Sequence, residues 1–216
     1  MCSITAILNS DATADELRAA ALTISKRQRH RGPDWSGVFQ CERTVLAHER
    51  LAIVDVTSGA QPLLDRDTGT ALAVNGEIYN HKQIRSKTPS FPYQTGSDCE
   101  VILGLYREFG RNLVDHLEGM FAFVLCDVTK NQWLIGRDPI GIIPLYYGHT
   151  SEGALMIASE MKGIEPYCED ISEFPPGHVW SSEDAAPQPY YDELWMNWET
   201  APKRAYKKEE LRAELE

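Results

Sequence analysis

Short apolar segments of strand length, separated by turns, constrain the fold of this chain more than any other feature. Residues 120–126 form a continuous apolar run, and a Lys130-Asn131 turn joins it to residues 132–136, which is typical of a β-hairpin. Because strands outnumber helices and hairpins outnumber β-α-β units, the pattern predicts antiparallel sheets covered by a few helices. Further strands are expected at residues 3–8, 44–47, 71–74, 143–147, 154–158 and 177–180.

Two amphipathic helices are expected, and each is preceded by residues with capping-box spacing. Thr13 and Glu16 stand before the first apolar stripe. Ser97 and Glu100 stand before the second, and Gly110 is expected to end that helix.

The composition changes near the C-terminal end of the chain. We expect residues 1–191 to form one domain, and residues 192–216 to be a linker and the truncated start of a second domain that is absent. Residues 207–216 favour a helix, but its apolar stripe is little more than Leu211 and Leu215. So little apolar surface does not stabilise a lone helix.

Charge and cysteine usage exclude several classes of function. The net charge of −11 at pH 7 argues against nucleic acid or an anionic membrane as a partner. No apolar run approaches the roughly 20 residues of a membrane span, and the N-terminus lacks the layout of a secretion signal. The five cysteines are scattered without a C-x-x-C pair, and the six histidines show no metal spacing. We therefore expect a cytoplasmic protein without disulfides or a metal site.

Cys2, directly behind the initiator Met1, is the first candidate for chemistry. Once Met1 is removed, Cys2 carries a thiol with a reference pKa of about 8.5 and an α-amine with one of about 7.7–8.0. The amine can then take the proton of the thiol, so one residue supplies both the nucleophile and its base. With Met1 retained, the same nitrogen is an amide and has no basicity.

Several polar residues stand at the ends of predicted elements, where a scaffold holds side chains rigidly. Arg50 offers a planar guanidinium suited to a carboxylate. The side-chain NH2 of Asn75 and the backbone N–H of Gly76 are suited to an oxyanion hole, in which each donor is worth about 3 kcal/mol. Glu77 and Asp98 can accept hydrogen bonds from an ammonium. With the thiol, these groups meet the requirements for cleaving the side-chain amide of a free amino acid.

Each of these residues also has an ordinary structural explanation. A surface ion pair is the commonest fate of an arginine such as Arg50. Asn75-Gly76 is a common hairpin turn signal, and Asp98 is favoured in a first helical turn by the helix dipole. His48 is interpreted as a residue that packs within a strand and has no part in the chemistry.

Ten segments, in order and at family spacing, resemble the class II glutamine amidotransferases. Eight of them carry the general resemblance: residues 2–4, 29–34, 48–51, 53–55, 59–62, 75–80, 95–100 and 119–123. Residues 136–146 and 158–162 narrow it to the glutaminase domain of bacterial glutamine-hydrolysing asparagine synthetases. The similarity covers about residues 2–180.

The resemblance implies an α+β fold of the N-terminal-nucleophile hydrolase type, a four-layer αββα sandwich of antiparallel sheets. It also implies a role for each matching residue. Cys2 is the nucleophile with its own α-amine as base, and Asn75 and Gly76 form the oxyanion hole. Arg50 holds the α-carboxylate of glutamine, and Glu77 and Asp98 bind the α-ammonium. The pocket is lined by the backbone of Leu51, Ala52, Ile53 and Val54.

The function that the resemblance implies is hydrolysis of L-glutamine to glutamate and ammonia, as the ammonia-supplying half of an ATP-dependent asparagine synthetase. The S-G-G-x-D-S pyrophosphate loop of the synthetase domain does not occur in this sequence. Mg-ATP is thus implied only for that missing domain, and no cofactor is expected in this chain. The expected partners are L-glutamine and a C-terminal synthetase domain or subunit, and a homodimer is compatible with the sequence. An amidotransferase subunit that feeds a different acceptor, and a non-catalytic relative with Met1 retained, remain as alternatives.

Overall fold

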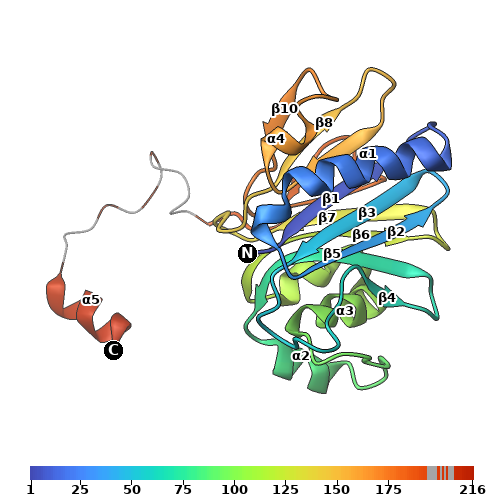
Figure 1. Ribbon diagram of the computed structural model, residues 1–216. Coiled ribbons are helices and arrows are strands. Elements are labelled where there is room, and N and C mark those ends of the chain that lie inside the picture. Colours follow the sequence, from blue (N-terminus) through green and yellow to red (C-terminus); the bar gives the residue numbers. More distant parts are fainter. Residues whose placement is uncertain (194–198, 200, 202, 204–206) are drawn as a thin grey trace.

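Two antiparallel sheets packed face to face form the centre of the computed structural model, which describes residues 1–193, 199, 201, 203 and 207–216 (Figure 1). Helix α1 (Ala14–Arg27) covers the outer face of one sheet, and α2 (His81–Lys87) and α3 (Val101–Phe109) cover the outer face of the other (Figure 1). The expected four-layer α+β sandwich is confirmed.

Each sheet has six strands within the described residues. The first sheet runs in the order β10 (Ile171–Glu173), β8 (Tyr146–His149), β9 (Leu155–Ala158), β1 (Ser3–Leu8), β3 (Thr44–Arg50) and β2 (Trp35–Cys41). The second runs in the order β12 (Gln188–Pro189), β11 (His178–Ser181), β7 (Gln132–Arg137), β6 (Gly119–Asp127), β5 (Thr70–Ile78) and β4 (Leu63–Asp65). The predicted hairpin corresponds to β6 and β7.

Strand alternation decides which side chains face the space between the sheets. Ile4 and Ala6 of β1 and Ala71 and Ala73 of β5 are buried in one apolar cluster between the two sheets. Successive strand residues point to opposite faces, so residues two positions further along point to the same side. The even-numbered Cys2 and the odd-numbered Asn75 therefore lie toward the inter-sheet space. Two other clusters hold the outer helical layers against the sheets.

One of the two predicted capping boxes is confirmed and the other is wrong. The Thr13 side chain accepts a hydrogen bond from the backbone of Glu16, and the Glu16 side chain bonds back to Thr13. Ser97 makes no such cap, and α3 begins only after a 3-10 turn at Asp98–Glu100. The Glu100 carboxylate instead accepts from the backbone N–H groups of Gln94 (2.6 Å) and Thr95 (2.9 Å), so it secures the preceding loop.

The predicted strand at residues 143–147 begins later, at Tyr146, because two buried ionic side chains hold the preceding residues in a loop. Arg137 Nε donates to the carbonyl of Ile143 (2.6 Å), and the Asp138 carboxylate accepts from the N–H groups of Ile142 and Ile143. The pattern did not predict β2, β4, β10, β12, α2 or the short α4 (Met161–Ile164).

The structure describes only part of residues 192–216, for which a linker and the start of a second domain are predicted. The expected helix is present as α5 (Lys208–Leu215), and none of its residues is buried. Most of the expected linker lies outside the described residues. Among the described residues, no helix has both the length and the apolarity required to cross a bilayer.

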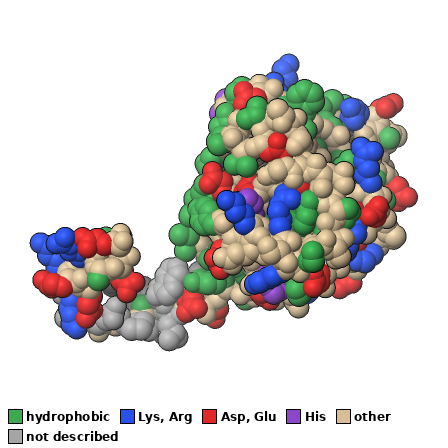
Figure 2. Space-filling model, turned by 90° about the horizontal axis from the view of Figure 1, so that it is seen from below, with side chains coloured by type: hydrophobic (Ala, Val, Ile, Leu, Met, Phe, Trp, Pro, Cys, Tyr) green, Lys and Arg blue, Asp and Glu red, His purple; other side chains and the backbone are tan. Residues whose placement is uncertain are grey.

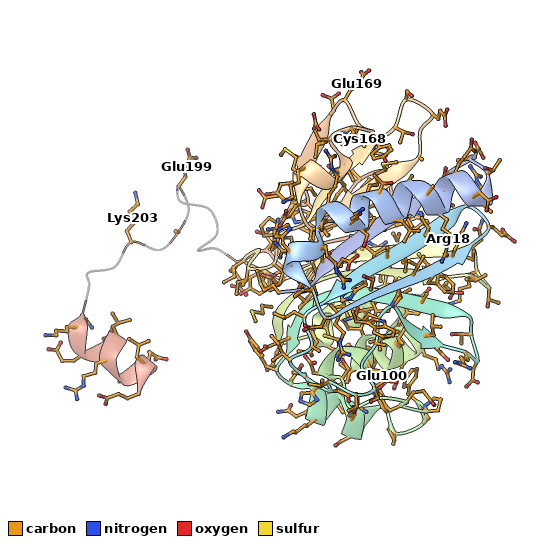
Figure 3. The ribbon with its side chains drawn as sticks, viewed as in Figure 1. Arg18, Glu100, Cys168, Glu169, Glu199 and Lys203 are labelled. Atoms are coloured by element: carbon orange, nitrogen blue, oxygen red, sulfur yellow. The ribbon has the colours of Figure 1, made fainter. Side chains whose placement is uncertain are left out.

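Charged side chains are scattered over one face of the molecule (Figure 2). Figure 2 shows acidic and basic groups interspersed over the face seen there. In Figure 3, Arg18 lies on α1 and Glu100 in the opposite helical layer, so the two labelled residues mark the two outer layers.

Candidate active site

A pocket opens at one end of the inter-sheet space, and its empty volume is about 570 Å³ when the open solvent at its mouth is included. Nine of the ten predicted site residues line it: Cys2, Arg50, Leu51, Ile53, Val54, Asn75, Gly76, Glu77 and Asp98. Ala52 is the exception, because its backbone N–H turns to the carboxylate of Asp34 (2.9 Å). Residues from both sheets and from the loop before α3 therefore meet at one place.

Cys2 lies directly before β1, next to the end of β3. Ser3 pairs with Glu49, so the next position brings Cys2 opposite Arg50. The Leu51 N–H donates to Cys2 Sγ (3.3 Å), and Arg31 Nε donates to the Cys2 carbonyl (2.9 Å). The backbone of Leu51 thus holds the sulfur, and the side chain of Arg31 holds the carbonyl of the same residue.

Burial raises the pKa of the Cys2 thiol above its ordinary value. The hydrogen bond from Leu51, the N-terminal ammonium and the Arg50 guanidinium all act to lower that pKa and offset part of the effect. Because the uncharged thiol is favoured by burial, a nearby base is required to generate the thiolate. In this chain Met1 precedes Cys2 and also lines the pocket, with 52% of its surface exposed.

Arg50 is buried at the end of β3, which rules out the surface ion pair as its explanation. Its Nη2 donates to the carbonyls of Val54 (3.0 Å) and Asp55 (2.5 Å). The Asp55 carboxylate in turn accepts from the N–H groups of Ser58 (3.1 Å) and Gly96 (2.7 Å). Arg50 and Asp55 together fold the loop that follows β3 across the pocket.

Asn75 and Gly76 lie inside β5 and do not form a turn. Asn75 pairs with Ala122 and Gly76 with Phe121 on β6. Gly76 has a φ of +148°, and a Cβ there would lie 2.1 Å from the Met120 carbonyl oxygen, so no other residue fits without moving β6.

The side-chain amide of Asn75 is the least satisfied group of the pocket. Its Nδ2 is buried and has no hydrogen-bond partner among the described residues. A buried donor without a partner costs about 1–3 kcal/mol, so its presence indicates an acceptor supplied from outside the chain.

Asp98 lines the pocket from the start of the 3-10 turn. It is buried, and its Oδ2 accepts the N–H of Ile78 (2.7 Å), which fixes the carboxylate against β5. Glu77 follows Gly76 on β5 and is only partly buried. The pocket therefore combines one buried guanidinium with two carboxylates, an arrangement that complements a zwitterion.

Sequence reasoning gave no role to several residues that line or support the pocket. Gln61 lines it and bonds with its side chain to the backbone of Val74. His48, interpreted as strand packing, is fully buried, and its Nε2 lies 2.9 Å from the Val74 carbonyl oxygen, which links the two sheets. No local spacing marks either contact. The other lining residues without a predicted role are Gly59, Ser97, Cys99, Met120 and Ile143.

No cluster of three or more His, Cys, Asp or Glu side chains suited to a metal ion occurs in the part of the chain that the structure describes.

The sequence is similar to a known protein family and to curated relatives. The family described as "Glutamine amidotransferase domain" matches residues 1–175. Asparagine synthetase B [glutamine-hydrolyzing] of Escherichia coli is 49% identical over 217 residues, which cover all of this chain and 39% of that protein. Asparagine synthetase [glutamine-hydrolyzing] 2 of Arabidopsis thaliana is 48% identical over 95% of this chain and 36% of its own length.

Two solved structures share the fold at low sequence identity. The glutamine phosphoribosylpyrophosphate amidotransferase of B. subtilis has a TM-score of 0.70 at 21% identity, over 87% of this chain and 48% of that one. An allosteric regulatory enzyme of purine biosynthesis has a TM-score of 0.74 at 20% identity, over 89% and 50%.

The family match extends over most of the chain, and the two asparagine synthetases are similar to it over nearly its whole length. The chain spans less than two fifths of the length of those curated relatives. The resemblance expected from the ten segments is confirmed: the chain belongs to the glutamine amidotransferase domain family.

Proposed function

We propose that this chain hydrolyses L-glutamine to glutamate and ammonia, with Cys2 as the nucleophile after removal of Met1. The observation that carries the proposal is the convergence of Cys2, Arg50, Asn75 and Asp98 on one pocket, where Asn75 Nδ2 has no hydrogen-bond partner among the described residues.

Substrate binding follows from the charges of the pocket. The Arg50 guanidinium binds the α-carboxylate of glutamine, because a planar fork of donors matches a carboxylate. Glu77 and Asp98 accept hydrogen bonds from the α-ammonium. These contacts direct the side-chain amide toward Cys2, which lies opposite Arg50 in the strand register.

The first half of the reaction forms a thioester. The free α-amine of Cys2 takes the thiol proton, and the thiolate attacks the amide carbon of glutamine. The negative charge on the former carbonyl oxygen is stabilised by Asn75 Nδ2 and the Gly76 N–H. The α-ammonium then protonates the nitrogen, the C–N bond breaks, and ammonia leaves.

The second half restores the enzyme. Water gives a proton to the α-amine and attacks the thioester carbon, and the same two donors stabilise the second oxyanion. The C–S bond breaks, the sulfur recovers its proton, and glutamate leaves. The cycle requires no group beyond the chain and water.

The mechanism is tested on protein from which Met1 has been removed, as shown by its intact mass. Cys2→Ala is expected to abolish glutamate release from glutamine, and a glutamine-analogue electrophile is expected to label Cys2. Cys41→Ala, which changes a thiol on β2 outside the pocket, is the matched control and should retain activity. Activity in Cys2→Ala, or an adduct on another cysteine, would refute the mechanism. Retention of Met1 in the functional protein would favour a non-catalytic relative.

We further propose that the ammonia feeds a synthetase domain or subunit that activates its acceptor with Mg-ATP. The support is the 36–39% share of the two asparagine synthetases that this chain covers. The chain alone is expected to release ammonia without consuming ATP, while the chain joined to its partner is expected to form asparagine from aspartate. Transfer to another acceptor, measured by mass spectrometry of the products, would assign it to a different amidotransferase.

A further inference from the structure

The ladder between β4 and β5 continues by one rung beyond the end of β4, through a side chain. Leu63 pairs with Leu72, so the next position with the same alternation places Gln61 opposite Val74. At that position the carboxamide of Gln61 replaces the backbone of the missing strand residue. Its Nε2 donates to the Val74 carbonyl (2.9 Å), and the Val74 N–H donates to its Oε1 (2.7 Å). A primary amide carries the same donor and acceptor as a peptide group, so it can replace one rung.

Gln61 is itself held in place by the other sheet. Only 8% of its surface is exposed, and a Cβ at Gly37 of β2 would lie 1.8 Å from the Gln61 carbonyl oxygen, so the two backbones are in close contact. His48 provides a second polar contact to the same Val74 carbonyl, at 2.9 Å. The peptide unit that leads into Asn75 is therefore bound from two directions.

This anchoring matters because, apart from the pairing of β5 with β6, no hydrogen bond among the described residues holds the amide nitrogen of Asn75 in place. Its Nδ2 has no partner among the described residues, so the backbone position and the side-chain rotamer together decide where the donor lies. An error of about 1 Å in the position of a catalytic group can reduce a rate about 100-fold. Val74 is the residue directly before Asn75, and its contact with Gln61 holds this part of β5 on the side opposite β6.

We propose that Gln61 is a positioning residue for the oxyanion hole: its carboxamide extends the β4–β5 ladder to Val74 and so aligns Asn75 Nδ2 with the developing oxyanion. The inference rests on the proposed glutaminase function. It assigns to Gln61 no contact with glutamine.

The test compares the kinetics of Gln61→Met with those of the parent chain, both with Cys2 at the N-terminus. Methionine keeps the length of the side chain and loses both hydrogen bonds. Because an oxyanion hole acts in the transition state, kcat for glutamate release is expected to fall roughly 10- to 100-fold, with KM within about threefold. Gln40→Met is the matched control, since Gln40 also bonds a backbone carbonyl, that of Ala14, but lies outside the pocket. Its kcat should be unchanged.

A double-mutant cycle separates positioning from general destabilisation. If Gln61 acts through Asn75, then Gln61→Met should reduce kcat less than about threefold further in an Asn75→Ala background. An equal loss in both backgrounds, a rise in KM alone, or an unchanged kcat in the single variant would overturn the inference.

Failure of the inference is distinguishable from failure of the proposed function. A parent chain with a free Cys2 that does not hydrolyse glutamine refutes both, whereas an active parent with an unaffected Gln61→Met refutes the positioning role alone. If Gln61→Met does not fold, Gln61→Glu provides the same test at pH 8. Its carboxylate keeps an acceptor for the Val74 N–H but cannot donate to the carbonyl, so a lower kcat is again expected. An unchanged kcat in that variant counts against the inference as well.

Discussion

The two walls of the pocket are held by different chemistry. Behind the nucleophile, Arg31 binds the Cys2 carbonyl through Nε and the Glu160 carboxylate through Nη1 (3.1 Å). His30 (2.9 Å) and Lys162 (2.8 Å) also contact Glu160. The nucleophile wall therefore rests on a cluster of charges near the surface.

Neutral groups support the oxyanion wall. Val74, which leads into Asn75 and Gly76, is bound by the carboxamide of Gln61 and by the imidazole of His48. Burial lowers the pKa of His48 to about 4, so the ring is uncharged near neutral pH and donates through Nε2.

Depth explains the difference between the walls. The side chain of Glu160 is 22% exposed, whereas His48 is fully buried between the sheets. Charges lose more hydration energy the deeper they lie, so a deep scaffold is more stable when built from neutral hydrogen-bonding groups. The two walls should consequently respond differently to mutation and to pH.

The oxyanion wall should show the largest kinetic effect. Asn75→Ala is expected to lower kcat for glutamine hydrolysis by about 100- to 1000-fold with little change in KM, because its donor acts on charge that develops in the transition state. The free energy of unfolding should not fall, since Nδ2 has no partner to lose among the described residues. Steady-state kinetics and denaturant unfolding measure the two quantities. A raised KM at constant kcat would remove Asn75 from the oxyanion hole.

Arg50→Ala should produce the opposite kinetic pattern. Loss of a charge-assisted contact to the α-carboxylate, worth roughly 3 kcal/mol, is expected to raise KM about 100-fold while kcat changes only a few-fold. Arg43→Ala is a suitable control, because the side chain of Arg43 is 57% exposed and lies outside the pocket. If KM for glutamine is the same in Arg50→Ala and the parent chain, the carboxylate is bound elsewhere.

His48 should make the deep scaffold sensitive to mild acid. Its folded-state pKa of about 4 lies below the ordinary 6.5. The unfolded chain then binds the proton more readily, so the stability that depends on neutral His48 is complete above pH 6.5 and is lost as the pH falls toward 4. The loss at pH 5 is about 2 kcal/mol. In His48→Asn the free energy of unfolding should vary less between pH 7 and 5. An equal slope in both proteins would show that His48 titrates normally.

The charged scaffold should respond only to stronger acid, and the effect should be the smallest because Glu160 is partly exposed. Partial burial acts to raise the pKa of Glu160, but Lys162, Arg31 and His30 lower it to about 2, from 4.5. Its stabilisation is therefore present above pH 4.5 and is lost as the pH falls toward 2. Glu160→Gln is expected to destabilise the chain by about 1–2 kcal/mol at pH 7, and the difference should vanish near pH 2. A difference independent of pH would argue against the ion pairs.

Local patterns were sufficient to predict antiparallel sheets covered by helices, and the resemblance of the ten segments supplied the four-layer sandwich and the candidate site residues. The apolar run of β6, the cap at Thr13 and the stop at Gly110 are local features, and each appears in the structure as predicted. Cys2 and Asn75 stood out because their functional groups suit a reaction.

The supporting residues could not be found in this way. Gln61 has no distinctive spacing, and its contact with Val74 exists only once β4 and β5 are paired. Glu100 satisfied the spacing rule for a capping box, yet its carboxylate binds the preceding loop. Both outcomes depend on tertiary geometry, which short-range rules do not contain.

The pairing of β5 with β6, which runs from Thr70 opposite Asp127 to Ile78 opposite Gly119, has a consequence for biosynthesis. A shift of one residue during assembly would reverse the side to which every side chain of β5 points. The Asn75 amide would then enter the helical layer, and the thiol would face the side chain of Val74 or the bare backbone of Gly76. Correct alignment of these two internal strands, which the helical segment from α2 to α3 separates in the sequence, is therefore required before the molecule can act on a substrate.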